Sequence, residues 1–437
     1  MKIEESMKNS FQESPEIDFL YTFAFEDGKR DLEVMHKLLD YLGNPHLSEV
    51  EYIHVTGTNG KGSVCASVHS VLKEKYHAGL YLSPHVYRFN ERIIVDDKEI
   101  ENRYITSFVN DFKPILKKIE KELRKPSFFE IITSMAFKYF SESRCKLAII
   151  EVGLGGRLDP TNVIKPLVSA ITSIDLEHTH ILGNTIESIA YEKAGIIKPG
   201  IPVVIGKMDT RALQVIEETA RNKGARIYNT PSEYEVGEII QRLDGMSFKV
   251  SGNNTEYKIN FPLVGRHQVN NVLIALKILE LLQDRYPINK SDIESGLAKV
   301  RLPGRFEIKL KKPLLIFDIA HNPAASRALA NTVKDLNLEN VTLLFSVLKD
   351  KDVDGILRNL SEISDNIVVT EIGYEERRMP AEMIEKCAKK YFKRIKVIKQ
   401  CCAALEYALE SSDVIVATGS AYLLRELEIC LKLLMHA

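Results

Sequence analysis

A glycine-rich segment, residues 55–63, holds the residues whose types and spacing most clearly indicate chemistry. Its sequence is Val-Thr-Gly-Thr-Asn-Gly-Lys-Gly-Ser, and it follows a short apolar run. Glycines let several backbone N–H groups point at one anion, a following helix N-terminus adds partial positive charge, and Lys61 supplies a full charge. The segment therefore predicts a nucleotide phosphate site. The strict phosphate-loop pattern is not met, because Val55 replaces its first glycine and Gly62 stands where Ser or Thr is usual; a glycine-rich turn with a surface lysine is the alternative.

Three further side chains lie at strand ends or on a helix. Glu151 ends an apolar run and begins the glycine-rich loop 151–162, so it is a candidate Mg²⁺ ligand, with an exposed turn residue as the alternative. His178 follows the run 167–171 and is a candidate metal or phosphate contact, although a lone histidine is more often a structural hydrogen-bonder. Lys193 lies in a helix-like segment, where a solvated surface charge is the usual role of lysine.

A second group of candidates lies late in the chain. Asp318 and His321 come just past an apolar run and before a helix, and Asn322 next to them could simply cap that helix. Arg305 is a candidate phosphate clamp or an ordinary linker charge. These residues join the first group only if the later part of the chain faces the earlier part.

Alternating apolar runs and amphipathic stretches favour parallel sheets covered by helices. We expect strands at residues 52–55, 147–152, 167–171 and 201–205, a hairpin over 248–261 turning at Asn253-Asn254, and a helix over about 270–283. Beyond a linker at 301–305, strands are expected at 314–317, 341–345, 367–370, 395–398 and 414–417. We therefore predict an α/β protein with two domains. Residues 1–300 form a phosphate-loop ATPase-like domain with a parallel sheet, and residues 301–437 form a smaller Rossmann-like domain.

The composition favours an enzyme that acts on small molecules. A chain of 437 residues with 45% hydrophobic content exceeds what one core usually serves. Lys and Arg number 59 against 60 Asp and Glu, so no basic field argues for nucleic acid. Six cysteines without a C-x-x-C pair indicate neither a disulfide framework nor a zinc site, and favour a reducing compartment. The polar N-terminus and the lack of a long apolar run predict a soluble, cytoplasmic protein with no membrane partner.

Nine motifs, in order along the chain, resemble those of the folylpolyglutamate synthase/dihydrofolate synthase family within the Mur ligase superfamily. They are G-T-N-G-K-G-S, S-P-H (83–85), R-F-N-E-R-I (88–93), E-V-G-L-G-G-R-L-D (151–159), L-G-N-T (182–185), E-K-A-G-I-I-K-P-G (192–200), H-Q-V-N-N (267–271), P-G-R-F-E (303–307) and D-I-A-H-N-P (318–323). The resemblance implies a Mur-ligase central-type domain over residues 1–300 that binds ATP and the pterin substrate. It implies a C-terminal Mur-ligase-type domain over 301–437 that closes on nucleotide and glutamate.

The implied reaction joins a pteroate or folate carboxylate to the amine of L-glutamate. ATP converts the carboxylate into an acyl phosphate, and the amine then expels phosphate, so the site needs positioning and charge neutralisation more than a nucleophile. By resemblance, Lys61, His178 and Lys193 take part in catalysis, and Lys193 carries a carbamate. The implied ATP-binding residues are Thr58, Asn59, Gly60, Lys61, Gly62, Ser63, Asn271, Arg305, Asp318 and His321. The implied Mg²⁺ ligands are Ser83, Glu151 and His178, with Ser63 as a further candidate.

The resemblance also implies a pterin site. It covers Ser127, Phe128, Phe129, Glu130, Leu158, Asp159 and Pro160. Either phenylalanine is a candidate to stack on a pterin ring, and core packing is the alternative. The chain departs from the family where Glu177 and His180 stand in place of Asp and Pro160 in place of Ala; the first two flank His178.

The resemblance implies ATP and Mg²⁺, with a monovalent cation as a further candidate, and a monomer whose partners are ATP, L-glutamate and dihydropteroate or folates. It does not choose between dihydrofolate synthase, folylpolyglutamate synthase and a bifunctional enzyme. One alternative is the same ligase chemistry on another pterin-type or peptide-like acceptor. Another is a phosphate-loop switch or regulatory ATPase, which would not need the motifs P-G-R-F-E and D-I-A-H-N-P.

Overall fold

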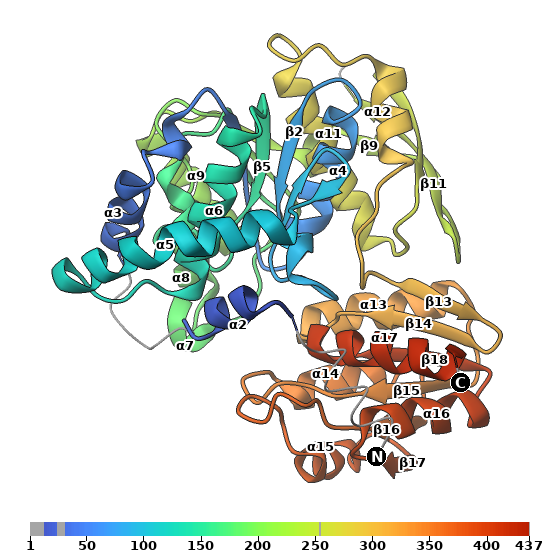
Figure 1. Ribbon diagram of the computed structural model, residues 1–437. Helices are drawn as coiled ribbons and strands as arrows, with labels where there is room; N and C mark the ends of the chain where they lie inside the picture. The colour runs from blue at the N-terminus through green and yellow to red at the C-terminus, as the bar shows by residue number, and fades with distance from the viewer. Residues whose placement is uncertain (1–12, 24–30, 253–254, 437) are drawn as a thin grey trace.

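Two α/β units make up the computed structural model, which describes residues 13–23, 31–252 and 255–436 (Figure 1). The first is built on an eight-stranded sheet and the second on a six-stranded sheet. Their order along the chain agrees with the predicted fold class, which is confirmed. Within these residues, no helix is both long and apolar enough to cross a membrane.

The eight-stranded sheet has the order β4-β3-β2-β5-β1-β6-β7-β8. Its strands are β1 (Glu51–Thr56), β2 (Ala78–Tyr81), β3 (Ile93–Val95), β4 (Lys98–Glu99), β5 (Leu147–Glu151), β6 (Val168–Ile171), β7 (Val203–Ile205) and β8 (Ile227–Asn229). The six strands from β2 to β8 in this order are mutually parallel, whereas β3 and β4 pair antiparallel at the edge. The central strands are buried on both faces, which explains their nearly continuous apolar sequences.

Helices cover both faces of this sheet (Figure 1). One face packs against α4 (Lys61–Leu72) and α11 (His267–Leu282), and α12 (Lys290–Leu297) packs against α4 on the same side. The helices of the other face are α2 (Pro15–Tyr21), α3 (Glu33–Tyr41), α5 (Asn102–Glu122), α6 (Phe128–Glu142), α8 (Ile186–Ala194) and α9 (Thr210–Asn222). Short helical pieces are η1 (Pro45–Leu47), η2 (Phe89–Arg92), η3 (Pro160–Val163), α7 (Thr179–Leu182) and α10 (Thr230–Glu233). Helix α4 is buried from Gly62 onward because it lies between the sheet and other helices.

The predicted hairpin is present as β11 (Gly245–Gly252) and β12 (Thr255–Phe261), which pair antiparallel. Met246, Phe248 and Val250 alternate with more exposed residues and point into the core. The strands β9 (Glu235–Val236) and β10 (Ile240–Arg242) complete this small sheet. The expected turn at Asn253-Asn254 lies outside the described residues.

The six-stranded sheet of the second domain has the order β13-β14-β18-β15-β16-β17, parallel except for β13. Its strands are β13 (Glu307–Lys311), β14 (Leu314–Asp318), β15 (Val341–Phe345), β16 (Asn366–Val369), β17 (Arg394–Val397) and β18 (Val414–Thr418). One face is covered by α13 (Pro323–Asp335), α14 (Val353–Leu360) and α15 (Ala381–Ala388), and the other by α16 (Cys401–Ser411) and α17 (Ala421–His436). Each face has its own apolar core.

A disulfide joins Cys402 of α16 to Cys430 of α17, which the cysteine spacing did not indicate. The two residues are 28 positions apart and meet only because their helices pack side by side. The expectation that the cysteines indicate no disulfide is therefore wrong for this pair. Cys65, Cys145, Cys387 and Cys401 are free thiols.

Candidate active site between the two domains

Four adjacent parallel strands of the first domain, β2, β5, β1 and β6, end at the same edge of the sheet. Glu151 is the last residue of β5, and Ser83, the loop at 57–60 and the segment 172–178 follow the ends of β2, β1 and β6. Ligands of open α/β sheets bind at this edge, most often where neighbouring connections diverge. The topology therefore gathers the first group of sequence candidates at one place.

The phosphate loop is held by its neighbours at the end of β6. The N–H of Thr58 donates to the carbonyl of Ser173 over 2.8 Å, and the N–H of Asn59 donates to the Ser173 hydroxyl over 3.1 Å. Gly60 has φ +86°, and a Cβ there would lie 2.3 Å from the Asn271 side-chain oxygen, so the position requires glycine. Lys61 Nζ donates to the carbonyls of residues 57 and 58 over 3.0 and 3.1 Å, folded back along the loop.

The other loop and helix candidates adjoin this turn. Asn271, 7% exposed, donates to the Gln268 side chain over 2.8 Å. Gly62 and Ser63 are buried in the first turn of α4, whose N-terminus carries partial positive charge. The backbone of this turn is therefore arranged as an anion site needs.

Glu151 is buried, with 5% exposure, and faces the start of α4. Its Oε2 accepts the N–H of Ser83 over 2.9 Å, and a Cβ on Gly62 would lie 3.7 and 3.8 Å from its two carboxylate oxygens. Burial raises the pKa of Glu151, and the charges of Lys61 and Arg305 with the Ser83 N–H oppose that rise. The alternative of an exposed turn residue is wrong.

Lys193 is 4% exposed, so the alternative of a solvated surface charge is also wrong. Burial and the positive charge of Lys61 lower the pKa of Lys193 to about 7, against the opposing charges of Glu177, Asp159 and Asp175. The amine is therefore half neutral at pH 7. A neutral amine is the form that can react with CO₂.

The residues expected to bind Mg²⁺ fit that ion only in part. His178 caps α7 with φ +50°, and burial with the charge of Lys351 lowers its pKa to about 4. No hydrogen bond joins His178 to Glu151 or Ser83, and the described residues hold no group of three or more His, Cys, Asp and Glu side chains placed to bind a metal. Buried Glu151 and the Ser83 hydroxyl are hard oxygen donors beside the phosphate loop. They suit Mg²⁺, which keeps several water and phosphate ligands.

The second domain contributes Arg305 and Asp318 to the same place. Burial lowers the pKa of Arg305, while the charges of Asp318 and of Glu151 from the first domain oppose that shift. The Asp318 carboxylate accepts the N–H groups of Phe306 and Ala320, both over 2.9 Å. Burial raises the pKa of Asp318, and the Arg305 charge opposes the rise. Arg305 is therefore a cation beside the buried carboxylate of the other domain.

The segment 318–323 also contacts the first domain directly. Asn322 Nδ2 donates to the Asn59 side-chain oxygen of the phosphate loop over 3.1 Å. His321 Nδ1 lies 2.9 Å from the carbonyl of Ile319, and its Nε2 lies 3.2 Å from Glu177 Oε1. Burial opposes ionisation of Glu177, but the hydrogen bond and charge of His321 outweigh it and hold the pKa of Glu177 well below its usual range. Two sequence motifs far apart in the chain thus meet across the domain boundary.

Of the residues expected at the pterin site, the polar ones at the start of α6 cap that helix, and Phe128 packs against other side chains. Ser127 and Glu130 form a capping box at the start of α6, and Arg124 pairs with Glu130 over 2.7 Å. Their polar groups are thus committed to the helix end. The Phe128 ring stacks on Tyr21 at 5.3 Å, and the Arg92 guanidinium lies over it at 5.4 Å.

Phe129 and Asp159 line the neighbouring part of this region. The Phe129 ring covers Gly153, where a Cβ would lie 2.4 Å from it. Asp159 is 3% exposed and accepts the N–H groups of Thr161 and Leu154 over 3.0 and 2.9 Å. Leu158 and Pro160 flank it, and Pro160 begins η3.

Arg92 is a candidate that the motif R-F-N-E-R-I contained without a role. It is 7% exposed, and among the described residues no carboxylate lies within ion-pair distance of it. Its Nε donates to His85 Nδ1 over 2.8 Å. A buried cation beside Phe128, with no ion pair in the part of the chain that the structure describes, suits an anionic substrate group. The only signal in the sequence was its place in the motif.

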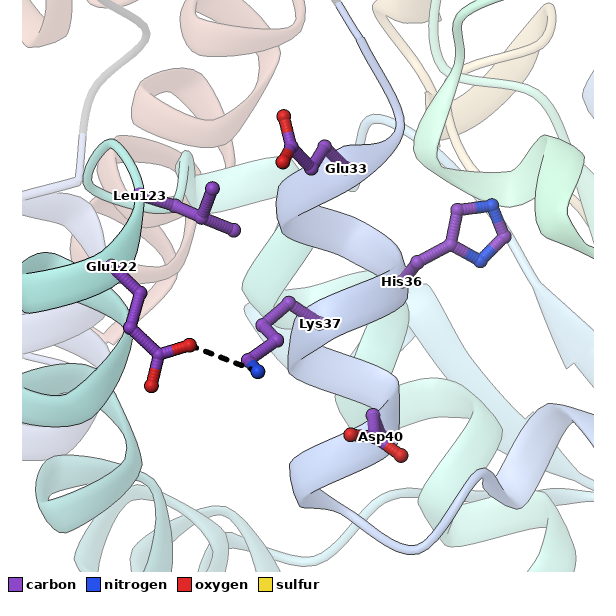
Figure 2. A pocket seen from close by; sticks show the side chains of 6 residues that line it. All are labelled: Glu33, His36, Lys37, Asp40, Glu122 and Leu123. Carbon is purple, nitrogen blue, oxygen red and sulfur yellow. Dashed lines mark ion pairs between the residues drawn. The ribbon is translucent and has the colours of Figure 1, made fainter.

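A surface hollow between α3 and the end of α5 is separate from this candidate site (Figure 2). Glu33, His36, Asp40 and Leu123 line it with Lys37 and Glu122, which form an ion pair over 2.9 Å. None of the predicted site residues lies there. We assign this hollow no role.

Comparison with known proteins gives independent matches to the two domains. Residues 55–279 match the family described as the Mur ligase middle domain, and residues 304–421 match the Mur ligase glutamate ligase domain. A curated relative, the dihydrofolate synthase/folylpolyglutamate synthase of Bacillus subtilis, is 34% identical over 412 residues, which cover 92% of this chain and 95% of the relative.

Two solved structures are also similar over nearly their full length. The folylpolyglutamate synthase of Thermotoga maritima has a TM-score of 0.82 and 37% identity, covering 94% of each chain. That of Mycobacterium tuberculosis, solved with ADP, has a TM-score of 0.88 and 30% identity, covering 97% of this chain and 98% of the other.

Proposed function

The chain belongs to the folylpolyglutamate synthase/dihydrofolate synthase family of Mur ligases, and from this we propose that it joins L-glutamate to a pteroate or folate acceptor in an ATP-dependent reaction. The acceptor carboxylate attacks the γ-phosphorus of ATP, forming an acyl phosphate and releasing ADP. The glutamate amine then attacks the acyl carbon, inorganic phosphate leaves, and an amide bond remains. The products are ADP, phosphate and the glutamylated acceptor.

One observation carries this proposal: the hydrogen bond between Asn59 and Asn322, which joins the phosphate loop to the D-I-A-H-N-P segment across 263 residues of sequence. A nucleotide held by that loop lies against the second domain, beside Arg305. Transfer of a phosphoryl group between two anions needs fixed cationic and N–H groups around it. Lys61, Arg305 and the first turn of α4 are such groups. A switch ATPase has no need of the second domain's arginine.

The residues of the first domain have separable roles in this proposal. Glu151 and Ser83 would hold Mg²⁺, which when bound would neutralise phosphate charge around the γ-phosphoryl group. Lys193, whose amine is half neutral at pH 7, takes up CO₂ as a carbamate and becomes an anion. His178 completes this side of the site when the nucleotide is bound. The nucleotide ribose lies near Asp318.

The acceptor binds next to α6. Phe128 and Phe129 are both partly exposed, and either ring is available to meet a pterin ring. Arg92, buried and without an ion-pair partner among the described residues, suits the acceptor carboxylate or a glutamyl group. Asp159, held by backbone N–H groups, accepts from ring N–H groups.

An assay of ADP release tests the proposal directly. ADP should appear only when L-glutamate and a pteroate or folate acceptor are both present, and dihydropteroate and reduced folates supplied separately identify the preferred acceptor. ATP consumption that ignores both additions would favour a switch ATPase. Turnover with glutamate but only with a non-pterin acid would favour the alternative acceptor class.

A further inference from the structure

Glu177 is anchored in the first domain, but the polar groups it contacts belong to the second. It lies between β6 and α7, one residue before His178, and its side chain is 12% exposed. Its Oε1 is 3.1 Å from Asn322 Nδ2, 3.2 Å from His321 Nε2 and 3.6 Å from Lys351 Nζ. One carboxylate oxygen therefore faces three groups of the second domain, two within hydrogen-bond distance and the Lys351 ammonium at ion-pair distance.

Asn322 is the centre of this arrangement because its whole side-chain amide is in use. Its Nδ2 donates one hydrogen to Asn59 Oδ1 and the other to Glu177 Oε1, both over 3.1 Å. Its Oδ1 accepts the N–H of Ala325 over 2.8 Å and so caps α13. A single amide thus ties the start of a helix in the second domain to the phosphate loop and to the segment before His178. We refer to Glu177, His321, Asn322, Lys351 and Asn59 as the interdomain clasp.

The length of the Glu177 side chain matters for this contact. Replacing Glu177 by Asp tests that length. Asp is shorter by one carbon–carbon bond, about 1.5 Å. At that reach, contacts of 3.1 and 3.2 Å would open beyond hydrogen-bond distance unless the domains moved closer.

From this geometry we infer that Glu177 is a positioning residue that fixes the closed arrangement of the two domains before substrates bind. Closure keeps Arg305 and His321 at the phosphate loop, so the nucleotide does not have to bring the domains together itself. A binding-competent state that is already populated strengthens apparent affinity in proportion to its population. The inference rests on the proposed function only for its effect on turnover, because closure itself can be measured without substrate.

The experiment compares Glu177→Ala, Glu177→Gln and Glu177→Asp with the wild-type protein and with Glu187→Gln. Glu187 is a matched control on α8 that is half exposed and pairs with Arg211 of the same domain over 3.9 Å. Solution scattering of the ligand-free proteins should give a larger radius of gyration for Glu177→Ala than for the wild type. The nonhydrolysable analogue AMPPCP added with folate should reduce that difference. Glu177→Gln keeps the Asn322 contact but loses the charge, so its radius of gyration should lie between those of the wild type and Glu177→Ala.

Steady-state kinetics distinguish a role of Glu177 in domain closure from a role in stability or in metal binding. Hydrogen bonds to charged groups change an equilibrium by about ten- to a hundredfold, so the KM for ATP of Glu177→Ala should rise by up to that factor. The kcat should stay within about threefold, because bound substrates then hold the domains together. Glu177→Asp should resemble Glu177→Ala if reach is decisive. The Mg²⁺ dependence and the unfolding temperature should match those of Glu187→Gln.

Two results would overturn the inference. One is scattering of Glu177→Ala equal to wild type together with an unchanged KM for ATP. The other is a collapse of kcat with altered Mg²⁺ dependence, which would move Glu177 to the metal site. The two proposals can also fail separately. If the wild-type protein has no ligase activity but Glu177→Ala still enlarges the radius of gyration, the proposed function is refuted and the interdomain clasp is upheld.

Discussion

Substitution of Lys193 is the most informative perturbation. Its buried environment favours the neutral amine, and the proposed carbamate requires that same form. An ordinary lysine, with a pKa of about 10.4, has about one neutral amine in 2,500 at pH 7. Burial beside Lys61 lowers the pKa of Lys193 to about 7, so half of its amines are neutral at that pH. The fraction able to react with CO₂ therefore rises about a thousandfold.

Replacing Lys193 by Ala or Met removes the carbamate and its negative charge. Loss of one positioned charged group typically costs about a hundred- to a thousandfold in kcat, and we expect that loss in ADP release with both substrates present. Formate or acetate should restore part of the turnover in the Ala variant, where space remains, and less in the Met variant. Lys290→Ala, on the exposed surface of α12, is the matched control. ¹³C-bicarbonate should add a carbamate signal to the NMR spectrum of the wild type only.

Near-normal turnover of a folded Lys193→Met protein would refute this reasoning, as would a carbamate signal that survives the substitution. A pH profile gives a second check. Because the folded pKa is lowered, the neutral amine should become rare below about pH 7, and turnover at limiting bicarbonate should fall there.

Three other perturbations have defined outcomes. Glu151→Gln should raise the Mg²⁺ concentration needed for half-maximal turnover and lower kcat without lowering the unfolding temperature, since burial already disfavours the charged form; a large loss of stability would contradict this. Gly60→Ala should weaken AMPPCP binding measured by calorimetry, because φ is +86° and its Cβ would meet Asn271; unchanged affinity would exclude a tight loop. Burial raises the pKa of Glu426 to about 7, so the folded state holds this proton more tightly than the unfolded state. Protonated Glu426 therefore adds about 3 kcal/mol to the free energy of unfolding below about pH 4.5, and this stabilisation is lost as the pH rises through 7. Urea unfolding at pH 5 and 8 should show that slope in the wild type and lose it in Glu426→Gln.

The predicted architecture held where burial on both faces made strands apolar. All nine single strands expected from apolar runs are present, as are the two hairpin strands, within a residue or two at most ends. The strand β2 was missed because its sequence is Ala-Gly-Leu-Tyr. Gly79 is required there since Phe140 lies 2.7 Å from where a Cβ would be, a constraint set by α6 and invisible in the local pattern. The short edge strands β3, β4 and β8 had too few residues to form a periodic signal.

The sequence placed the candidate residues at strand ends but could not place them relative to one another. Local context left Glu151 open between a metal ligand and an exposed turn residue and made Lys193 look like a surface charge, whereas packing in the folded chain buries both. The roles assigned to the site residues and the domain limits at residue 300 stay predictions. The contacts of Asn322 depend on how two domains meet, which no local pattern encodes. Cys402 and Cys430 likewise meet through helix packing alone.

The transfer of an oxygen atom tests the central claim most directly. If an acyl phosphate forms, one carboxylate oxygen of the acceptor ends in inorganic phosphate. With acceptor labelled by ¹⁸O in its carboxylate, we predict one ¹⁸O in each phosphate released during glutamate ligation, detected by mass spectrometry or by the ³¹P NMR isotope shift. Phosphate released without label, at the same rate of amide formation, would contradict the account.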